Sequence, residues 1–244
     1  MEDPDFHPPV NPMPATVTLL FLALAGIEIV LSLAEAGIIG GPAAVGWRLA
    51  LIRDYGFSGD VFDWMVANMQ FPLRELSRVV SYSFIHLGFT HAIFACVLLL
   101  ALGKMVAEAM GQVAFLAIFF VSGIFGAVVY ALVLNDPVWL VGAYPSVYGL
   151  IGGYSFVMWR KLAGQGEQQY RAFSLIAVLM GLQLIWGVFF DAGTQWLAEL
   201  LGFVCGFALC FIFAPGEWSK LRGRIQGAER GPAPCPPGFC AIWK

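Results

Sequence analysis

The chain has 244 residues, of which 59% are hydrophobic and 12% are charged, and its mean hydropathy is +0.79. Soluble domains carry about 25% charged residues, so this composition excludes an ordinary soluble protein and indicates a protein of the lipid bilayer. The net charge of -3 without a block of basic residues gives no reason to expect nucleic acid as a partner, whereas lipid headgroups near single arginines remain possible partners.

The N-terminal segment, residues 1–15, is expected to be a cytoplasmic tail. It contains Glu2, Asp3 and Asp5 but no lysine or arginine, so it lacks the basic flank of a secretory signal. We therefore expect the first apolar stretch to be retained as a membrane helix.

Six stretches are apolar and close to the about 20 residues that a membrane helix requires. They cover residues 16–33, 79–103, 113–134, 139–158, 173–190 and 196–213. Lysine and arginine follow the second, fourth and sixth stretches, whereas the short loops around Asp136 and Asp191 contain neither. By the positive-inside rule both termini face the cytoplasm. The sequence thus predicts an all-α polytopic protein, with its membrane domain over residues 16–214, in a bacterial inner membrane.

The first predicted span contains an acidic residue, Glu28. An ionisable side chain at membrane depth is costly unless it has a partner. We expect Glu28 to lie near the helix end or to pair inside the bundle with a polar group such as Gln183. The alternative is a proton pathway or a contact with a partner protein.

The long first loop, residues 37–76, breaks the charge pattern because it holds Arg48, Arg53 and Arg74 on the side that should face away from the cytoplasm. Long loops obey the positive-inside rule poorly, and acidic residues offset these arginines. The loop also mixes aromatic and polar residues, as a segment in the membrane interface does. It predicts a membrane-embedded flap, with Trp47, Phe57 and Trp64 as candidate partner contacts.

Two histidines, His86 and His91, lie in the second predicted span. Residues five apart are about 140° apart around a helix, so the two rings do not share a face as a metal-binding i, i+4 pair would. This spacing favours buried structural histidines, and we expect neither a metal nor another cofactor.

The fourth and sixth predicted spans are rich in small residues. Pro145 stands near the start of the fourth span, where proline suits a first helical turn. Gly149 and Gly153 on the fourth span, and Gly202 and Gly206 on the sixth, have the four-residue spacing of closely packed membrane helices.

These segments resemble three motifs of the rhomboid family of intramembrane serine proteases. The fourth-helix motif, Gly-x-Ser-Gly-x-x-Tyr-Gly, matches Gly142, Tyr148 and Gly149, which places Tyr144 at the nucleophilic serine. The resemblance implies a six-helix bundle with a long interfacial first loop.

Each of the other two motifs also matches at some positions and differs at a catalytic one. The second-helix motif, His-x-x-x-x-His-x-x-x-Asn, matches His86 and His91 but has Ala95 in place of the oxyanion-binding asparagine. The sixth-helix motif, Ala-His-x-x-Gly-x-x-x-Gly, matches at Gly202 and Gly206 but has Glu199 in place of the general base.

The resemblance therefore implies a retained scaffold with a degenerate catalytic site. Ser146 lies about 200° round the helix from Tyr144, so it should face away from the groove. We hypothesise that Tyr144 and Glu199 instead form a structural hydrogen bond between the fourth and sixth helices.

Three functions remain open. The first is a non-catalytic pseudoprotease that binds transmembrane segments of other proteins, as a scaffold, an assembly factor or a subunit of a membrane complex. The second is an active intramembrane serine protease. The third is a transporter or pigment-binding subunit, which would predict inverted repeats or a chromophore; we find no internal repeat.

The C-terminal segment, residues 215–244, is proline-rich and basic and ends in an apolar stretch that contains Phe239 and Trp243. It predicts either a solvated cytoplasmic tail or a docking peptide for a partner subunit. The cysteines predict no disulfide framework, because Cys96, Cys205 and Cys210 fall in apolar stretches and Cys235 and Cys240 lie in this tail.

Overall fold

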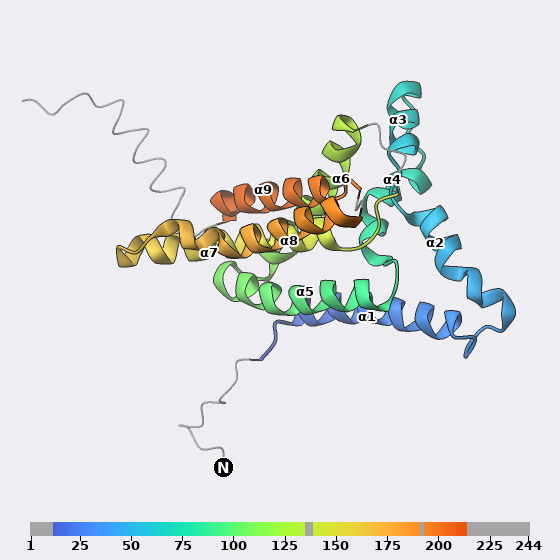
Figure 1. Cartoon of the computed structure of the whole chain (residues 1–244), viewed down its shortest axis with the longest axis horizontal. Helices are drawn as coiled ribbons and strands as arrows, with labels where there is room; N and C mark the ends of the chain where they lie inside the picture. The colour runs from blue at the N-terminus through green and yellow to red at the C-terminus, as the bar shows by residue number, and fades with distance from the viewer. Residues whose placement is uncertain (1–11, 135–138, 191–192, 214–244) are drawn as a thin grey trace, which may run out of the picture.

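A computed structural model describes residues 12–134, 139–190 and 193–213 of the chain (Figure 1). Over these ranges the regular structure is helical, apart from one isolated antiparallel bridge between Phe57 and Leu140. The long helices are α1 (Ala15–Glu35), α5 (Phe89–Met110), α6 (Gln112–Val133), α7 (Tyr144–Gln165), α8 (Ser174–Phe190) and α9 (Trp196–Phe213). They correspond one to one to the six predicted spans.

Four of these helices, α1, α5, α6 and α9, are long and apolar enough to cross a membrane, which makes this an integral membrane protein. The count of six spans stays a prediction. α8 has 17 residues, and α7 has 22 but is less apolar. α7 lies at the centre of the bundle and packs on α5, α6 and α9, and the small residues Ser146, Gly149, Gly152, Gly153 and Ser155 are buried in these contacts.

Backbone contact between α7 and α9 organises the bundle. A Cβ on Gly202 would lie 2.1 Å from the carbonyl oxygen of Pro145, and a Cβ on Gly206 would lie 2.1 Å from that of Gly149. The reciprocal close contact comes from Gly152, which faces the backbone of Phe203. Gly153, predicted to form a closely packed face with Gly149, faces Val106 of α5.

The first loop is folded into short helices: η1 (Pro42–Gly46), α2 (Trp47–Tyr55), α3 (Gly59–Asn68) and α4 (Leu73–Ser81), followed by η2 (Tyr82–Phe84). Figure 1 places α2, α3 and α4 at one end of the long helices, while α1 and α5 lie side by side along one edge. Phe57 and Leu140 exchange backbone hydrogen bonds of 3.1 and 2.8 Å, which tie the loop to the segment before α7.

Two predicted helix starts are wrong. The second span was expected from residue 79, but α4 and η2 end at Phe84 and the helix α5 begins at Phe89 after an extended link. The break lies at Ile85 and Gly88, whose backbone angles are extended, while the Arg78 guanidinium donates to the carbonyl oxygens of Arg53 and Gly56 and attaches α4 to the first loop. The fourth span begins at Tyr144 instead of residue 139, because Gly142 has a φ of +99° that a helix does not allow.

Candidate functional site

The candidate site lies where the link before α5 meets the first turn of α7. Tyr144 stands on α7 and His91 on α5, and their rings stack with centroids 4.6 Å apart. The Tyr144 hydroxyl donates a hydrogen bond of 3.1 Å to the backbone carbonyl of His91. The phenol is therefore held against α5 by two contacts to the same residue.

The ring of His86 is fully buried beside this pair, with its centroid 5.5 Å from that of His91. Its Nε2 accepts a hydrogen bond of 3.3 Å from the Ala143 backbone N–H, so in the neutral ring the proton is on Nδ1. That Nδ1 is buried and has no hydrogen-bond partner among the described residues. Burial lowers the pKa of His86 to about 4, so the ring is neutral at pH 7.

The two histidines do not lie on one helix, which corrects the sequence-based geometry. His86 is in the extended link, and His91 is the third residue of α5. His91 Nδ1 accepts a hydrogen bond of 3.3 Å from the Leu87 N–H, which folds the link back onto the helix start. The two rings are neighbours because the chain reverses between them.

Gly142 is required by this arrangement of rings. A Cβ at this position would lie 2.7 Å from His91 Cε1, and the φ of +99° is rarely adopted by other residues. Its N–H donates a hydrogen bond of 2.9 Å to the backbone carbonyl of Tyr82, which anchors the turn before α7. The turn before α7 therefore requires a glycine at this position.

Tyr144 donates its hydrogen bond to the backbone carbonyl of His91, so the hypothesis of a hydrogen bond between Tyr144 and Glu199 is wrong. The Glu199 carboxylate is buried in the first turn of α9 and accepts hydrogen bonds from Gln183 Nε2 of α8 and from the Tyr148 hydroxyl of α7. The physical reason is that stacking on His91 directs the Tyr144 phenol toward α5, whereas Tyr148 and Gln183 supply the donors to Glu199.

The other positions near these motifs are buried. Ala95 is fully buried in the apolar core and has no hydrogen-bond donor on its side chain. Ser146 is buried against Gly123 of α6, so it faces away from the histidines as the sequence predicts. Tyr148 and Gly149 are buried on α7, and Gly149 faces Ser122 of α6.

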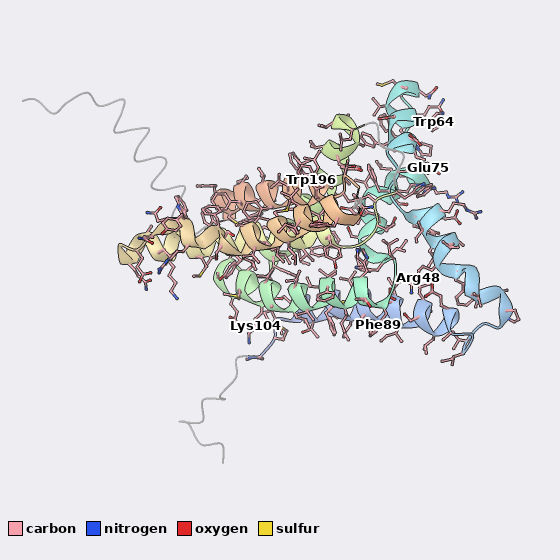
Figure 2. The ribbon with its side chains drawn as sticks, viewed as in Figure 1. Arg48, Trp64, Glu75, Phe89, Lys104 and Trp196 are labelled. Carbon is pink, nitrogen blue, oxygen red and sulfur yellow. The ribbon has the colours of Figure 1, made fainter. Side chains whose placement is uncertain are left out.

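Arg48 is the central residue that sequence reasoning missed. Two of its guanidinium nitrogens lie 2.9 Å from the two Glu28 oxygens, and two contact Glu35 at 2.7 and 3.0 Å. It also donates a hydrogen bond of 2.7 Å to the backbone carbonyl of His86. These bonds, the one to Glu28 first, raise the pKa of Arg48 and keep it charged although it is only 4% exposed. Figure 2 labels Arg48 between α2 and α1.

Glu28 therefore pairs with Arg48, and the predicted pairing with Gln183 is wrong. The sequence did contain a signal for this pair, because both residues are unusual for their predicted places and they carry opposite charges. Glu28 is an acid in a membrane span, and Arg48 is a base in a loop on the side where basic residues are disfavoured. In the structure the two charges neutralise each other.

The predicted partner contacts fall into three groups. Trp47 and Trp64 are 41% and 47% exposed, and Figure 2 shows Trp64 on α3 at the outer end of the molecule. Phe57 is only 2% exposed and packs in the core, and Glu28 is buried in its ion pair, so both are wrong as surface contacts. Phe239 and Trp243 lie outside the described residues.

Comparison with known proteins adds a family assignment. Residues 73–216 match a family model described as "Rhomboid domain". The chain is 28% identical to RHOMBOID-like protein 4 of Arabidopsis thaliana over 55% of this chain and 33% of that protein. It is 29% identical to Rhomboid-like protease 3 of Toxoplasma gondii, over 55% of this chain and 51% of that protein.

A third relative is YdcA of Bacillus subtilis (strain 168), provisionally named a rhomboid protease. It is 29% identical over 57% of this chain and 67% of its own length. The chain thus spans between a third and two thirds of the relatives that it matches.

Proposed function

Because the chain belongs to the rhomboid family, we propose that it is a non-catalytic member that binds transmembrane segments of other membrane proteins. The observation that carries this proposal is the Tyr144 contact with His91. The position of the family nucleophile holds a phenol whose hydroxyl donates to a backbone carbonyl and whose ring is stacked.

Acyl transfer requires a nucleophile within reach of a general base and donors for the oxyanion. Neither requirement has support here. Tyr144 donates to a carbonyl oxygen, which cannot accept its proton as a base, and Glu199 is bonded to Gln183. Pro145 has no backbone N–H at the first turn of α7, and Ala95 has no side-chain donor.

The helix packing supports a binding role as scaffold, assembly factor or subunit. α7 and α9 are in close contact, Gly142 forms the turn before α7, and the first loop is folded into short helices. The expected site of action is a bacterial inner membrane, with both termini in the cytoplasm.

The test combines a chemical probe with a binding measurement. The purified protein in vesicles should stay unlabelled by a fluorophosphonate probe, and it should leave unstructured and transmembrane peptides uncleaved. A labelled transmembrane peptide should bind it with saturable energy transfer. Ser146→Ala is the matched control, because labelling that disappears in this variant would identify a serine nucleophile and overturn the proposal.

An active protease is the second candidate, and the names of the Bacillus and Toxoplasma relatives favour it. It requires Ser146 to reach a base, although Ser146 now faces α6. Hydrolysis of a peptide by the purified chain, lost in Ser146→Ala, would establish this alternative.

A further inference from the structure

An open apolar cavity lies between α1 and α2. Its volume is about 500 Å³, which is within the about 300–1,000 Å³ of most small-molecule sites. Four residues of α1 between Gly26 and Leu31 line it, together with Trp47, Ala50 and Leu51 of α2. A Cβ on Gly26 would meet nothing within 4 Å, so no part of the chain that the structure describes fills this space. The cavity is open to an apolar ligand from outside the chain.

The cavity lies at the depth of the lipid tails. Gly26 and Leu31 are in the second half of α1, one of the helices that are long and apolar enough to cross a membrane. With a rise of about 1.5 Å per residue, Leu31 is about 6 Å along the helix from Glu35, its last residue. Trp47, at the cavity wall, is a residue type that is enriched at the membrane interface. A lipid tail that enters the cavity therefore keeps its polar end near Glu35.

Glu35 gives this end of the cavity an unbalanced negative charge. Arg48 carries one positive charge but pairs with two carboxylates, those of Glu28 and Glu35. Glu28 is buried, whereas the side chain of Glu35 is 42% exposed. Each Glu35 oxygen accepts one hydrogen bond from Arg48, and a carboxylate has about four acceptor sites. Glu35 can therefore accept further hydrogen bonds from a cation outside the chain.

We propose that the cavity between α1 and α2 holds one acyl chain of a phosphatidylethanolamine molecule, whose ammonium group donates hydrogen bonds to Glu35. The apolar walls fit the chain, and the surplus negative charge fits the ammonium group. A choline headgroup has the same charge but no N–H to donate, and an anionic headgroup is repelled by Glu35. This inference concerns lipid binding and holds whichever function the protein has.

The experiment measures how brominated lipids quench the fluorescence of Trp47. The full-length protein is placed in vesicles of phosphatidylcholine and phosphatidylethanolamine with identical chains, and one of the two lipids carries bromine on its chains. The Trp47 signal is the difference between the wild type and Trp47→Phe. Brominated phosphatidylethanolamine should quench this signal with about two- to fivefold higher relative affinity, the range of an ion pair that is open to solvent.

Two variants and a control assign this preference. Glu35→Gln should remove it, because a carboxamide has no charge, while Arg48 keeps its pair with Glu28. Gly26→Leu places a side chain in the cavity, so it should lower the quenching by both lipids. Ala23→Leu is the matched control and should behave as the wild type, because Ala23 is exposed on the same helix but does not line the cavity.

Three results would overturn the proposal. These are equal quenching by the two lipids, stronger quenching by brominated phosphatidylglycerol, and a preference that survives in Glu35→Gln. Quenching by no lipid would also overturn it, and energy transfer between labelled copies would then identify a second copy of the chain as the occupant. If Gly26→Leu does not fold, the Glu35→Gln arm decides. The binding of transmembrane peptides is measured separately, so the proposed function stands or fails by itself.

Discussion

At the scale of single residues, the decisive substitution is Tyr144. Its ring and hydroxyl both contact His91, so the phenol is a structural part of the site. The family alignment by motif identified this position from the sequence. The contact itself was not predictable, because it depends on the reversal of the chain between His86 and α5.

Restoring the family dyad should not restore hydrolysis. We expect the double variant Tyr144→Ser with Glu199→His to cleave no faster than background. Pro145 and Ala95 leave the oxyanion without two donors, and a single missing donor costs about a hundredfold or more in rate. The measurement is cleavage of a fluorogenic transmembrane substrate, with a second variant that adds Ala95→Asn and Pro145→Gly. Efficient cleavage by the double variant alone would contradict the assignment of these two positions.

His86 should make stability fall in mild acid. Its pKa is about 4 when folded and about 6.5 when exposed, so the unfolded state binds the extra proton. The contribution to the free energy of unfolding is complete above pH 6.5 and is lost as the pH falls toward 4, by up to about 3 kcal/mol. His91, Glu28 and Arg48 are the charged or titratable groups that influence it.

Thermal unfolding in detergent between pH 4 and 8 measures this dependence. His86→Gln keeps an acceptor for the Ala143 N–H but does not titrate, so its unfolding temperature should vary less over this range. Parallel curves for the two proteins would assign the acid sensitivity to other groups.

At the scale of helices, the contact of α7 with α9 should be the most sensitive to added volume. A Cβ on Gly152 would lie 2.3 Å from the carbonyl oxygen of Phe203, so Gly152→Ala forces the backbones apart. We expect a loss of about 1–3 kcal/mol, the usual cost of overpacking.

Gly164 on the same helix is the matched control for Gly152. A Cβ there meets nothing within 4 Å, so Gly164→Ala should be neutral or stabilise by up to about 1 kcal/mol through helix propensity. Thermal unfolding of both variants checks the pair. A similar loss in both variants would contradict close packing at Gly152 as the cause.

The attachment of α2 should depend on Arg48. Arg48→Met leaves the buried Glu28 without its cation, which costs about 3–5 kcal/mol when one partner of a buried pair is removed. Arg53→Met, at a side chain that is 75% exposed, should change stability by about 0.5 kcal/mol or less. Limited proteolysis within residues 37–72 measures the effect, and equal cleavage rates in both variants would contradict an anchoring role for Arg48.

The existence of the helices was easier to predict from the sequence than the residues at which they begin. Apolar length identified six helical stretches because membrane helices need long apolar faces. The starts of α5 and α7 were misplaced because extended backbone at Ile85 and Gly88 and the positive φ of Gly142 interrupt the helices, which hydropathy does not measure. Arg48 was missed as the partner of Glu28, and Gln183 was assigned to Glu28 instead of Glu199, because pairing across helices requires knowledge of which faces meet.

At the scale of the whole molecule, the predicted family fold is supported by joint order and spacing of three motifs on three helices. Each motif alone is short and degenerate. The orientation in the membrane remains a prediction, because it depends on the distribution of lysine and arginine and not on packing.

That orientation has a direct test in intact bacterial cells. A cysteine placed at Gly164, at the end of α7, should react with a membrane-impermeant maleimide only after the inner membrane is opened. A cysteine at Gly41, in the first loop, should react before it. Both positions are exposed, so accessibility to the reagent is set by the side of the membrane. The reverse pattern would invert the predicted topology.

The bridge between Phe57 and Leu140 mechanically couples two regions that lie far apart in the sequence. Leu140 stands two residues before Gly142, whose turn sets the place of the His91 and Tyr144 rings. We therefore expect that displacing the first loop, for example with an antibody fragment that binds α3 at the exposed Trp64, shifts the turn that sets the position of these two rings.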